Sequence, residues 1–231
     1  MRGLPPPLAG VDLIEIIESM NMEKIACVVF DIGNVLIRWD PRNVYRRMGY
    51  TDAATSSIMA ETGLGEINHR VLDVGAPFGA TLAKLADRFP QHAEFILAFD
   101  TRWADMVGGA VDDSVVALRD LRRAGYPVYG LSNFSREKFD VVRVMFPFLD
   151  EFDHLVVSAD VGMVKPDAEI FELLIERTGL EPARALFIDD SADNIAAAKR
   201  IGFDTVLFKQ DETDLQAEFA RRGVSDGKTP S

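Results

Sequence analysis

The segment CVVFDIGNVL, residues 27–36, carries the clearest structural pattern in the chain. It opens with an apolar run rich in β-branched side chains, which predicts a buried strand, and Gly33 predicts a turn just after it. Asp31 lies where the strand ends. Ligands of open parallel sheets bind at the carboxyl ends of the strands, so the position of Asp31 is typical of a catalytic acid. A carboxylate that only caps the turn is the alternative at this point.

Strand and helix patterns alternate through the second half of the chain. The predicted helices are 112–124, 136–144, 166–178 and 194–201. The predicted strands are 126–132, 155–158, 185–189 and 205–208. Such alternation, with buried strands, predicts an α/β protein with a doubly wound parallel sheet.

A long helical segment separates the first two predicted strands. Roughly ninety residues lie between them, far more than a crossover connection needs. The pattern is helical almost throughout 42–111, so we expect an inserted α-helical cap domain there and a core domain formed by 23–41 and 112–222. Residues 1–22, within which Met20 or Met22 is an alternative start, are expected to be a disordered extension, and 223–231 a disordered tail.

Composition narrows the class of protein and its partners. The chain has 231 residues, 48% of them hydrophobic, and a net charge of −12. That charge opposes binding to nucleic acid or to an anionic membrane surface, since both are polyanions, and no apolar run approaches the ~20 residues of a membrane span. The single cysteine, Cys27, falls within the predicted first strand and leaves no disulfide, so a reducing cytoplasm is the expected compartment.

A second strand also delivers acids at its end. In LFIDDS, residues 186–191, Asp189 and Asp190 follow an apolar run. If this strand end meets that of Asp31 at one sheet edge, each carboxylate raises the pKa of the others unless a cation joins them. A set of oxygen ligands favours Mg²⁺, which shares its shell with a substrate phosphate. A purely structural double aspartate is the alternative.

Two further segments offer groups for an anionic substrate. Ser132 and Asn133 end the second strand and can donate hydrogen bonds to an oxyanion, although the pair is also common in turns. Lys165 precedes Pro166 at a predicted helix start, where the helix dipole disfavours a cation unless an anion lies in front of it. A solvated surface lysine is the alternative for Lys165.

Four motifs in this order resemble the haloacid dehalogenase superfamily of aspartate-nucleophile hydrolases. They are FDIGNV with Asp31, GLSN with Ser132, MVKPD with Lys165, and FIDDSADN with Asp189 and Asp190. The resemblance covers Ile25 to about Lys209 and includes a helical insert after the first motif, like one cap type of that superfamily. It implies a Rossmann-like core beneath the cap.

The resemblance also implies roles in phosphoryl transfer. Asp31 is the nucleophile, Ser132 and Asn133 bind the phosphoryl oxygens, and Lys165 offsets negative charge on the nucleophile and the phosphate. The implied activity is that of a phosphomonoester hydrolase acting on a small phosphorylated metabolite through an aspartyl-phosphate.

The metal site follows from the same resemblance. Mg²⁺ is expected to bind Asp31, the backbone carbonyl of Gly33, and Asp190 directly. Asp189 is expected to contact metal-bound water or Lys165. These groups complete the candidate site.

Gly33 departs from the pattern of the superfamily. Its phosphatases carry a second aspartate two residues after the nucleophile as general acid and base, and loss of such an acid costs ~10²–10⁴ in rate unless the leaving group is good or another group substitutes. A sugar 1-phosphate has such a leaving group, and the Asp-x-Gly-Asn opening is similar to that of a bacterial α-glucose-1-phosphate phosphatase subfamily. Asn34 and Asp40 are the nearby candidate substitutes.

Two other functions fit the same motifs. A 2-haloacid dehalogenase also lacks the second aspartate, but it uses no metal and gains nothing from crowded acids. A binding or regulatory protein that keeps the fold is the third hypothesis. The candidate substrate contacts are Arg38, Trp39, His69, Arg102 and Trp103. The protein is expected to be a monomer or a homodimer.

Overall fold

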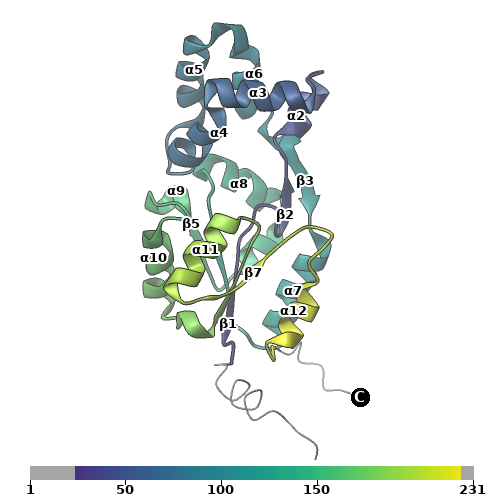
Figure 1. Cartoon of the computed structure of the whole chain (residues 1–231), viewed down its shortest axis with the longest axis vertical. Coiled ribbons are helices and arrows are strands. Elements are labelled where there is room, and N and C mark those ends of the chain that lie inside the picture. The colour runs from purple at the N-terminus through teal and green to yellow at the C-terminus, as the bar shows by residue number, and fades with distance from the viewer. Residues whose placement is uncertain (1–23, 225–231) are drawn as a thin grey trace, which may run out of the picture.

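The structure of the protein is a computed structural model that describes residues 24–224 (Figure 1). The expected N-terminal extension and residues 225–231 of the expected tail lie outside the described residues. Among the helices that are described, none combines the length and apolar character needed to cross a membrane.

Five parallel strands form the central sheet, in the order β5-β4-β1-β6-β7. Their bounds are β1 Cys27–Phe30, β4 Val128–Ser132, β5 His154–Val157, β6 Ala185–Asp189 and β7 Asp204–Leu207. Strand β1 is the middle strand because its short apolar run is buried on both faces. The expected parallel sheet is confirmed.

Helices surround this sheet and also form a separate group at one end of it. The helices that follow β3 in the chain are α7 Asp112–Arg123, α8 Arg136–Met145, α9 Ser158–Val161, α10 Ala168–Thr178, α11 Ala192–Ile201 and α12 Leu215–Arg221. The end group comprises α2 Arg42–Arg47, α3 Asp52–Thr62, α4 Leu64–Ile67, a π-helical turn Asn68–Leu72, α5 Phe78–Arg88, α6 Ala93–Thr101, and 3-10 turns at Pro90–His92 and Trp103–Met106. Further 3-10 turns are Pro147–Glu151 and Pro182–Arg184.

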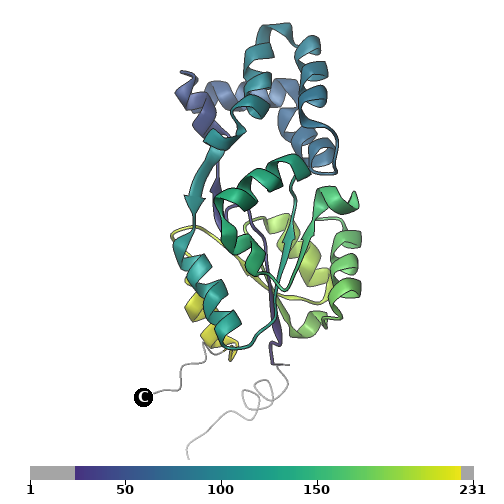
Figure 2. The ribbon, with the colours of Figure 1, turned by 180° about the vertical axis from the view of Figure 1, so that it is seen from behind.

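The two faces of the sheet pack against different helices, which makes the sheet doubly wound. Val28 and Phe30 of β1 belong to a buried cluster with residues of α7, α8 and α12, whereas Cys27 and Val29 belong to a second cluster with residues of α10 and α11. Figure 1 shows α11 in front of the sheet, and Figure 2, from behind, shows α7 and α8 there. The alternation follows from the two-residue period of a strand.

A short antiparallel ribbon joins the helical end group to the core. It consists of β2, Ile37–Trp39, and β3, Val107–Ala110. The expectation of an almost continuous helical pattern to residue 111 is wrong at β3. Its sequence, VGGA, lacks the β-branched alternation of a strand, and it is extended because it pairs with β2, almost seventy residues earlier.

The topology places the cap over the carboxyl ends of the central strands. In both views helices α2 to α6 lie beyond that end of the sheet, and the ribbon of β2 and β3 runs up to them (Figures 1 and 2). Any side chain that follows β1, β4 or β6 therefore lies between core and cap.

Candidate active site

Strand register brings Asp31 beside the second pair of acids. Phe30 pairs with Ile188, and the backbone N–H of Asp31 donates to the Ile188 carbonyl at 2.9 Å. One carboxylate oxygen from each of Asp31, Asp189 and Asp190 lies within 4.8 Å of the others. The predicted convergence of two acid-ended strands is confirmed.

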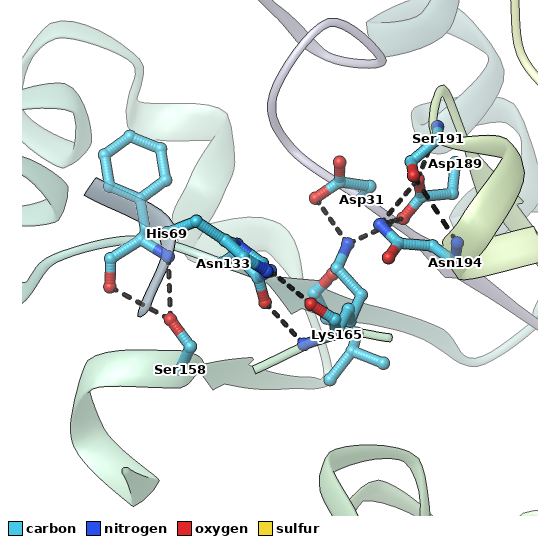
Figure 3. Close-up of polar contacts among 10 residues, drawn as sticks. Asp31, His69, Asn133, Ser158, Lys165, Asp189, Ser191 and Asn194 are labelled. Carbon is cyan, nitrogen blue, oxygen red and sulfur yellow. Dashed lines mark hydrogen bonds and ion pairs between the residues drawn. The ribbon is translucent and has the colours of Figure 1, made fainter. Parts of the chain in front are cut away.

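Lys165 lies between two of these acids. Its Nζ is 2.9 Å from Oδ1 of Asp31 and 2.7 Å from Oδ2 of Asp189, and it donates to the Leu131 carbonyl at 2.8 Å (Figure 3). Only 1% of the residue is exposed. Burial alone lowers the pKa of Lys165, but the charges of Asp189 and Asp31 outweigh it and raise the pKa above its usual value. Lys165 is therefore a buried cation, and the alternative of a solvated surface lysine is wrong.

Asp189 is fully occupied by protein donors. Besides Lys165, it accepts from the Ser191 backbone N–H at 2.8 Å and from the Asn194 side-chain amide at 3.0 and 3.1 Å (Figure 3). These bonds hold the carboxylate so that it fixes Lys165. Asn194, from the first turn of α11, is a site residue that the sequence analysis missed, although FIDDSADN contains it.

The three carboxylates of the acid cluster carry more negative charge than Lys165 alone balances. Burial, followed by the charges of Asp189 and Asp190, raises the pKa of Asp31 to about 7, against the opposing charge of Lys165. Burial and the charge of Asp189 also raise the pKa of Asp190. A divalent cation among these oxygens reverses both shifts. The oxygen-only donor set and the unbalanced charge therefore fit Mg²⁺.

The Asn133 side chain holds the backbone of Lys165 and also lines the cavity that contains Asp31. Its Oδ1 accepts from the Lys165 backbone N–H at 2.8 Å, and its Nδ2 donates to the Lys165 carbonyl at 2.9 Å. Ser132, 1% exposed, ends β4 and lines the same cavity as Asp31. The structure thus brings together all the predicted site residues, but it gives the Asn133 side chain a supporting task.

A cavity of about 160 Å³ lies between core and cap above Asp31. Its apolar walls are Ile37, Trp39, Phe78, Trp103, Val107, Phe134 and Val142. Gly33 also lines it, and a Cβ built on Gly33 meets no atom within 4 Å. The cavity therefore combines apolar walls with polar groups, which outside the acid cluster include Asn68, Asp73, Ser135 and Lys138.

Two of the five candidate substrate contacts line this cavity, namely Trp39 and Trp103. The other three do not. The Arg38 guanidinium donates to the Ala110 carbonyl, and Arg102 pairs with Asp105 at 2.9 Å. The ring of His69 lies 3.4 Å from the Asn133 amide, beside the site.

Two charged cavity residues were missed by the sequence analysis, Asp73 and Lys138. Asp73 follows the π-helical turn of the cap and is 7% exposed. Lys138 of α8 pairs across the seam with Asp100 of α6 at 2.5 Å, and its Nζ lies 4.6 Å from the Phe78 ring centre. No local pattern marks either residue, because each meets the cavity only through the docking of cap on core.

The two candidate substitutes for the missing aspartate have other contacts. Asp40 pairs with Arg42 at 2.8 Å and Arg46 at 3.2 Å, and it does not line the cavity. Partial burial opposes the effect, but the hydrogen bonds and charges of these arginines lower the pKa of Asp40. The side-chain oxygen Oδ1 of Asn34 accepts from the Trp39 backbone N–H at 3.0 Å, and the Asn34 side chain also forms a hydrogen bond with Asp190. Neither group is placed as a proton donor.

The chain is similar to known proteins over most of its length. Residues 25–202 match the family described as haloacid dehalogenase-like hydrolase. The sesquiterpene phosphatase astK of Aspergillus oryzae is 29% identical over 180 residues, covering 75% of this chain and 85% of that enzyme. An (S)-2-haloacid dehalogenase of Pseudomonas fluorescens is 34% identical over 119 residues, covering 49% of this chain and 52% of the dehalogenase.

Solved structures share the architecture. A HAD family enzyme of Bacteroides thetaiotaomicron, solved in complex with magnesium and inorganic phosphate, superimposes with a TM-score of 0.64 at 24% identity, covering 84% of this chain and 99% of that one. This likeness supports the fold. The family match contains Asp31, Ser132, Lys165 and the Asp189-Asp190 pair. The chain therefore belongs to the haloacid dehalogenase-like hydrolases.

Proposed function

We propose that this protein is a Mg²⁺-dependent phosphomonoester hydrolase that acts on a small phosphorylated metabolite through an aspartyl-phosphate on Asp31. The observation that carries the proposal is the arrangement of three buried residues, Asp31, Lys165 and Asp189, beside the exposed Asp190 at one sheet edge. A carboxylate held beside a buried cation is a suitable nucleophile for phosphorus, and the surrounding charges suit a transferring phosphoryl group.

Each residue of the site has its own role in the proposed reaction. Lys165 binds one oxygen of Asp31, so the other oxygen is directed away from it (Figure 3). That free oxygen attacks phosphorus in line with the leaving oxygen. Lys165 and the groups at the end of β4, including Ser132, stabilise the phosphoryl oxygens. Asp189 and Asn133 keep Lys165 in place from two sides.

Asp31, Asp190 and the Gly33 carbonyl are the groups that would hold Mg²⁺ in this site. Asp189 is less suited to direct ligation, because both of its oxygens already accept hydrogen bonds. When bound, Mg²⁺ supplies positive charge that neutralises the phosphoryl oxygens. The raised pKa of Asp31, about 7, returns toward that of an ordinary carboxylate in the presence of such a charge.

The cavity walls favour an apolar leaving group. Seven aromatic and aliphatic side chains line the cavity, and the cation in its wall outside the acid cluster, Lys138, is already paired with Asp100. Among the described residues, the cavity walls therefore contain no unpaired cation that could bind a second phosphate group of a substrate. An apolar alcohol agrees with the similarity to a sesquiterpene phosphatase, and it fits better than the sugar that the Asp-x-Gly-Asn resemblance favours.

The cap has to move for such a substrate to enter. The cavity volume of about 160 Å³ is below the ~300–1,000 Å³ typical of ligand pockets. The described arrangement therefore corresponds to a cap seated on the core. The ribbon of β2 and β3 is the connection about which the cap would open.

The crowded acids argue against dehalogenase chemistry. A haloacid substrate is itself a carboxylate, and Asp189 and Asp190 beside Asp31 repel it in the absence of a metal. The dehalogenase similarity covers about half of this chain.

The test is a release assay with and without Mg²⁺. The substrates are farnesyl monophosphate, a simple aryl phosphate, glucose 1-phosphate and 2-chloropropionate. We expect phosphate release that requires Mg²⁺ and is abolished in Asp31→Asn, with farnesyl monophosphate preferred over glucose 1-phosphate. Asp193→Asn is the matched control, since Asp193 belongs to the same motif but is exposed and outside the cavity. Halide release without metal, or equal activity of wild type and Asp31→Asn, contradicts the proposal.

A further inference from the structure

We propose that Asp73, a carboxyl of the cap, is the general acid and base that replaces the aspartate missing at Gly33. The inference rests on the proposed phosphomonoesterase function and deepens it. It answers how an enzyme with glycine at that position can release an alcohol, which is a poor leaving group without protonation.

Asp73 has the position that such a group requires. It lines the same cavity as Asp31, Ser132 and Lys165, and it comes from the cap side. The residue is 7% exposed, and its Oδ2 accepts a hydrogen bond at 3.4 Å from Nδ2 of Asn68, another residue of the cavity wall. A proton donor on the cap side lies opposite the nucleophile, where the leaving oxygen of an in-line displacement is found.

The backbone at Asp73 is fastened to the core. The Ser158 hydroxyl, on α9, donates to the Asp73 carbonyl at 2.5 Å and accepts from the Phe134 backbone N–H at 2.8 Å. Within the cap, the Asp73 N–H donates to the Asn68 carbonyl at 2.9 Å. Seating of the cap thus brings the carboxyl to a fixed place over the site.

Asp73 also has no ion-pair partner among the described residues. The lysines of the cavity are engaged elsewhere, Lys138 with Asp100 and Lys165 with Asp31 and Asp189. The nearby Arg70 pairs with Asp167 at 3.1 Å. A carboxyl left without a cation in a buried wall is costly unless it is protonated.

The electrostatic surroundings agree with this position. Burial raises the pKa of Asp73 to about 7, the charge of Asp31 adds to the rise, and a hydrogen bond from the Ser135 backbone opposes it. A large share of the carboxyls therefore carries a proton at neutral pH. An acid whose pKa is close to the working pH is suited to give up a proton and to take one back.

The reaction balances with Asp73 in both steps. In the first, the Asp31 oxygen forms a bond to phosphorus, the bond from phosphorus to the leaving oxygen breaks, and the proton of Asp73 passes to that oxygen. In the second, a water oxygen bonds to phosphorus, the Asp31 to phosphorus bond breaks, and the water proton passes to the Asp73 carboxylate. The products are an alcohol and inorganic phosphate, and both carboxyls regain their starting state.

The experiment compares Asp73→Asn with wild type on two phosphomonoesters with Mg²⁺ present. One has an alkyl alcohol as leaving group, and the other has p-nitrophenol, which leaves without a proton. We expect kcat/KM to fall ~10²–10⁴-fold for the alkyl ester and less than about tenfold for the aryl ester, since kcat/KM reports the steps up to departure of the leaving group. Slow breakdown of the aspartyl-phosphate should also give a burst of about one p-nitrophenol per enzyme.

A second variant separates proton transfer from a structural effect. Because a Cβ at Gly33 meets no atom within 4 Å, Gly33→Asp has room for a carboxyl at the position that other family phosphatases use. We expect Gly33→Asp in the Asp73→Asn background to restore activity on the alkyl ester. Asp87→Asn, an exposed cap aspartate, is the matched control and should behave as wild type.

Three results overturn the role of Asp73. They are wild-type activity of Asp73→Asn on the alkyl ester, equal losses in kcat/KM on both esters, and no rescue by Gly33→Asp. Each of these leaves the proposed function intact as long as Asp31→Asn abolishes turnover. Turnover that survives in Asp31→Asn defeats the proposed function instead.

Discussion

The variant Asp73→Asn should become increasingly more stable than wild type as the pH rises, even though the substitution removes a residue of the site. The amide keeps the size of the carboxyl and still offers an oxygen to the Ser135 N–H. It carries no charge at any pH. The wild-type carboxyl, in contrast, has a pKa of about 7 in the folded protein against 3.8 as its reference value, so folding favours its protonated form.

The sign and size of the effect follow from proton linkage. Between the two pKa values the folded state binds more protons than the unfolded state, so the stability of wild type falls as pH rises through this window. A tenfold change in proton affinity is ~1.4 kcal/mol, so a pKa raised from 3.8 to about 7 corresponds to about 4 kcal/mol in total. Wild type should lose about 3 kcal/mol of this stability between about pH 5 and pH 8.5. Asp73→Asn should show no such loss.

The assay is urea unfolding followed by circular dichroism at several pH values, without divalent cations. The free energy of unfolding of Asp73→Asn minus that of wild type should increase as the pH rises. Asp87→Asn makes the same chemical change at an exposed position and should run parallel to wild type. Parallel curves for Asp73→Asn as well would refute the reasoning, because they would mean that its carboxyl titrates alike in both states.

Three further outcomes test the rest of the site. Lys165→Met should destabilise the protein by about 3–5 kcal/mol in urea unfolding, since it leaves Asp31 and Asp189 buried without their cation; a loss below 1 kcal/mol contradicts a charged Lys165. Saturating Mg²⁺ should raise the melting temperature of wild type, and the stability gained at 100 times Kd should be ~2.7 kcal/mol. Asp190→Asn should lose most of that gain. An unchanged gain in this variant would mean that the ion binds elsewhere. Because burial raises the pKa of Cys27 to about 11, iodoacetamide should modify it only upon unfolding, and rapid modification of the native protein at pH 8 speaks against its buried position.

Much of the core was predictable because its signals are local. The run before Asp31 and the run before Asp189 are apolar segments of strand length, and each ends in an acid. Parallel strands deliver their carboxyl ends to one edge, so two such segments bring their acids together without further information. In the cap, helix α5, Phe78–Arg88, is likewise bounded by local signals, since Pro77 lies just before it and Pro90 shortly after it.

The ribbon between core and cap was not predictable in the same way. Gly108 and Gly109 have no strand propensity of their own, and β3 exists because β2 pairs with it. The same holds for Asn133, whose local pattern is that of an ordinary turn. Its task of holding the Lys165 backbone depends on a partner 32 residues away.

The amino-acid sequence alone was enough to predict the parallel α/β core, the family resemblance, and the acids and lysine of the candidate site, because strand periodicity and strand ends depend on neighbouring residues. Docking of the cap on the core settled what lies opposite Asp31. Asp73 and Lys138 follow no motif, and they reach the cavity only through contacts between segments far apart in the chain, such as Ser158 with Asp73, 85 residues apart, and Lys138 with Asp100, 38 residues apart. The charge state and surroundings of a buried carboxyl depend on such contacts, since desolvation and neighbouring charges are properties of the packed chain and not of the local sequence.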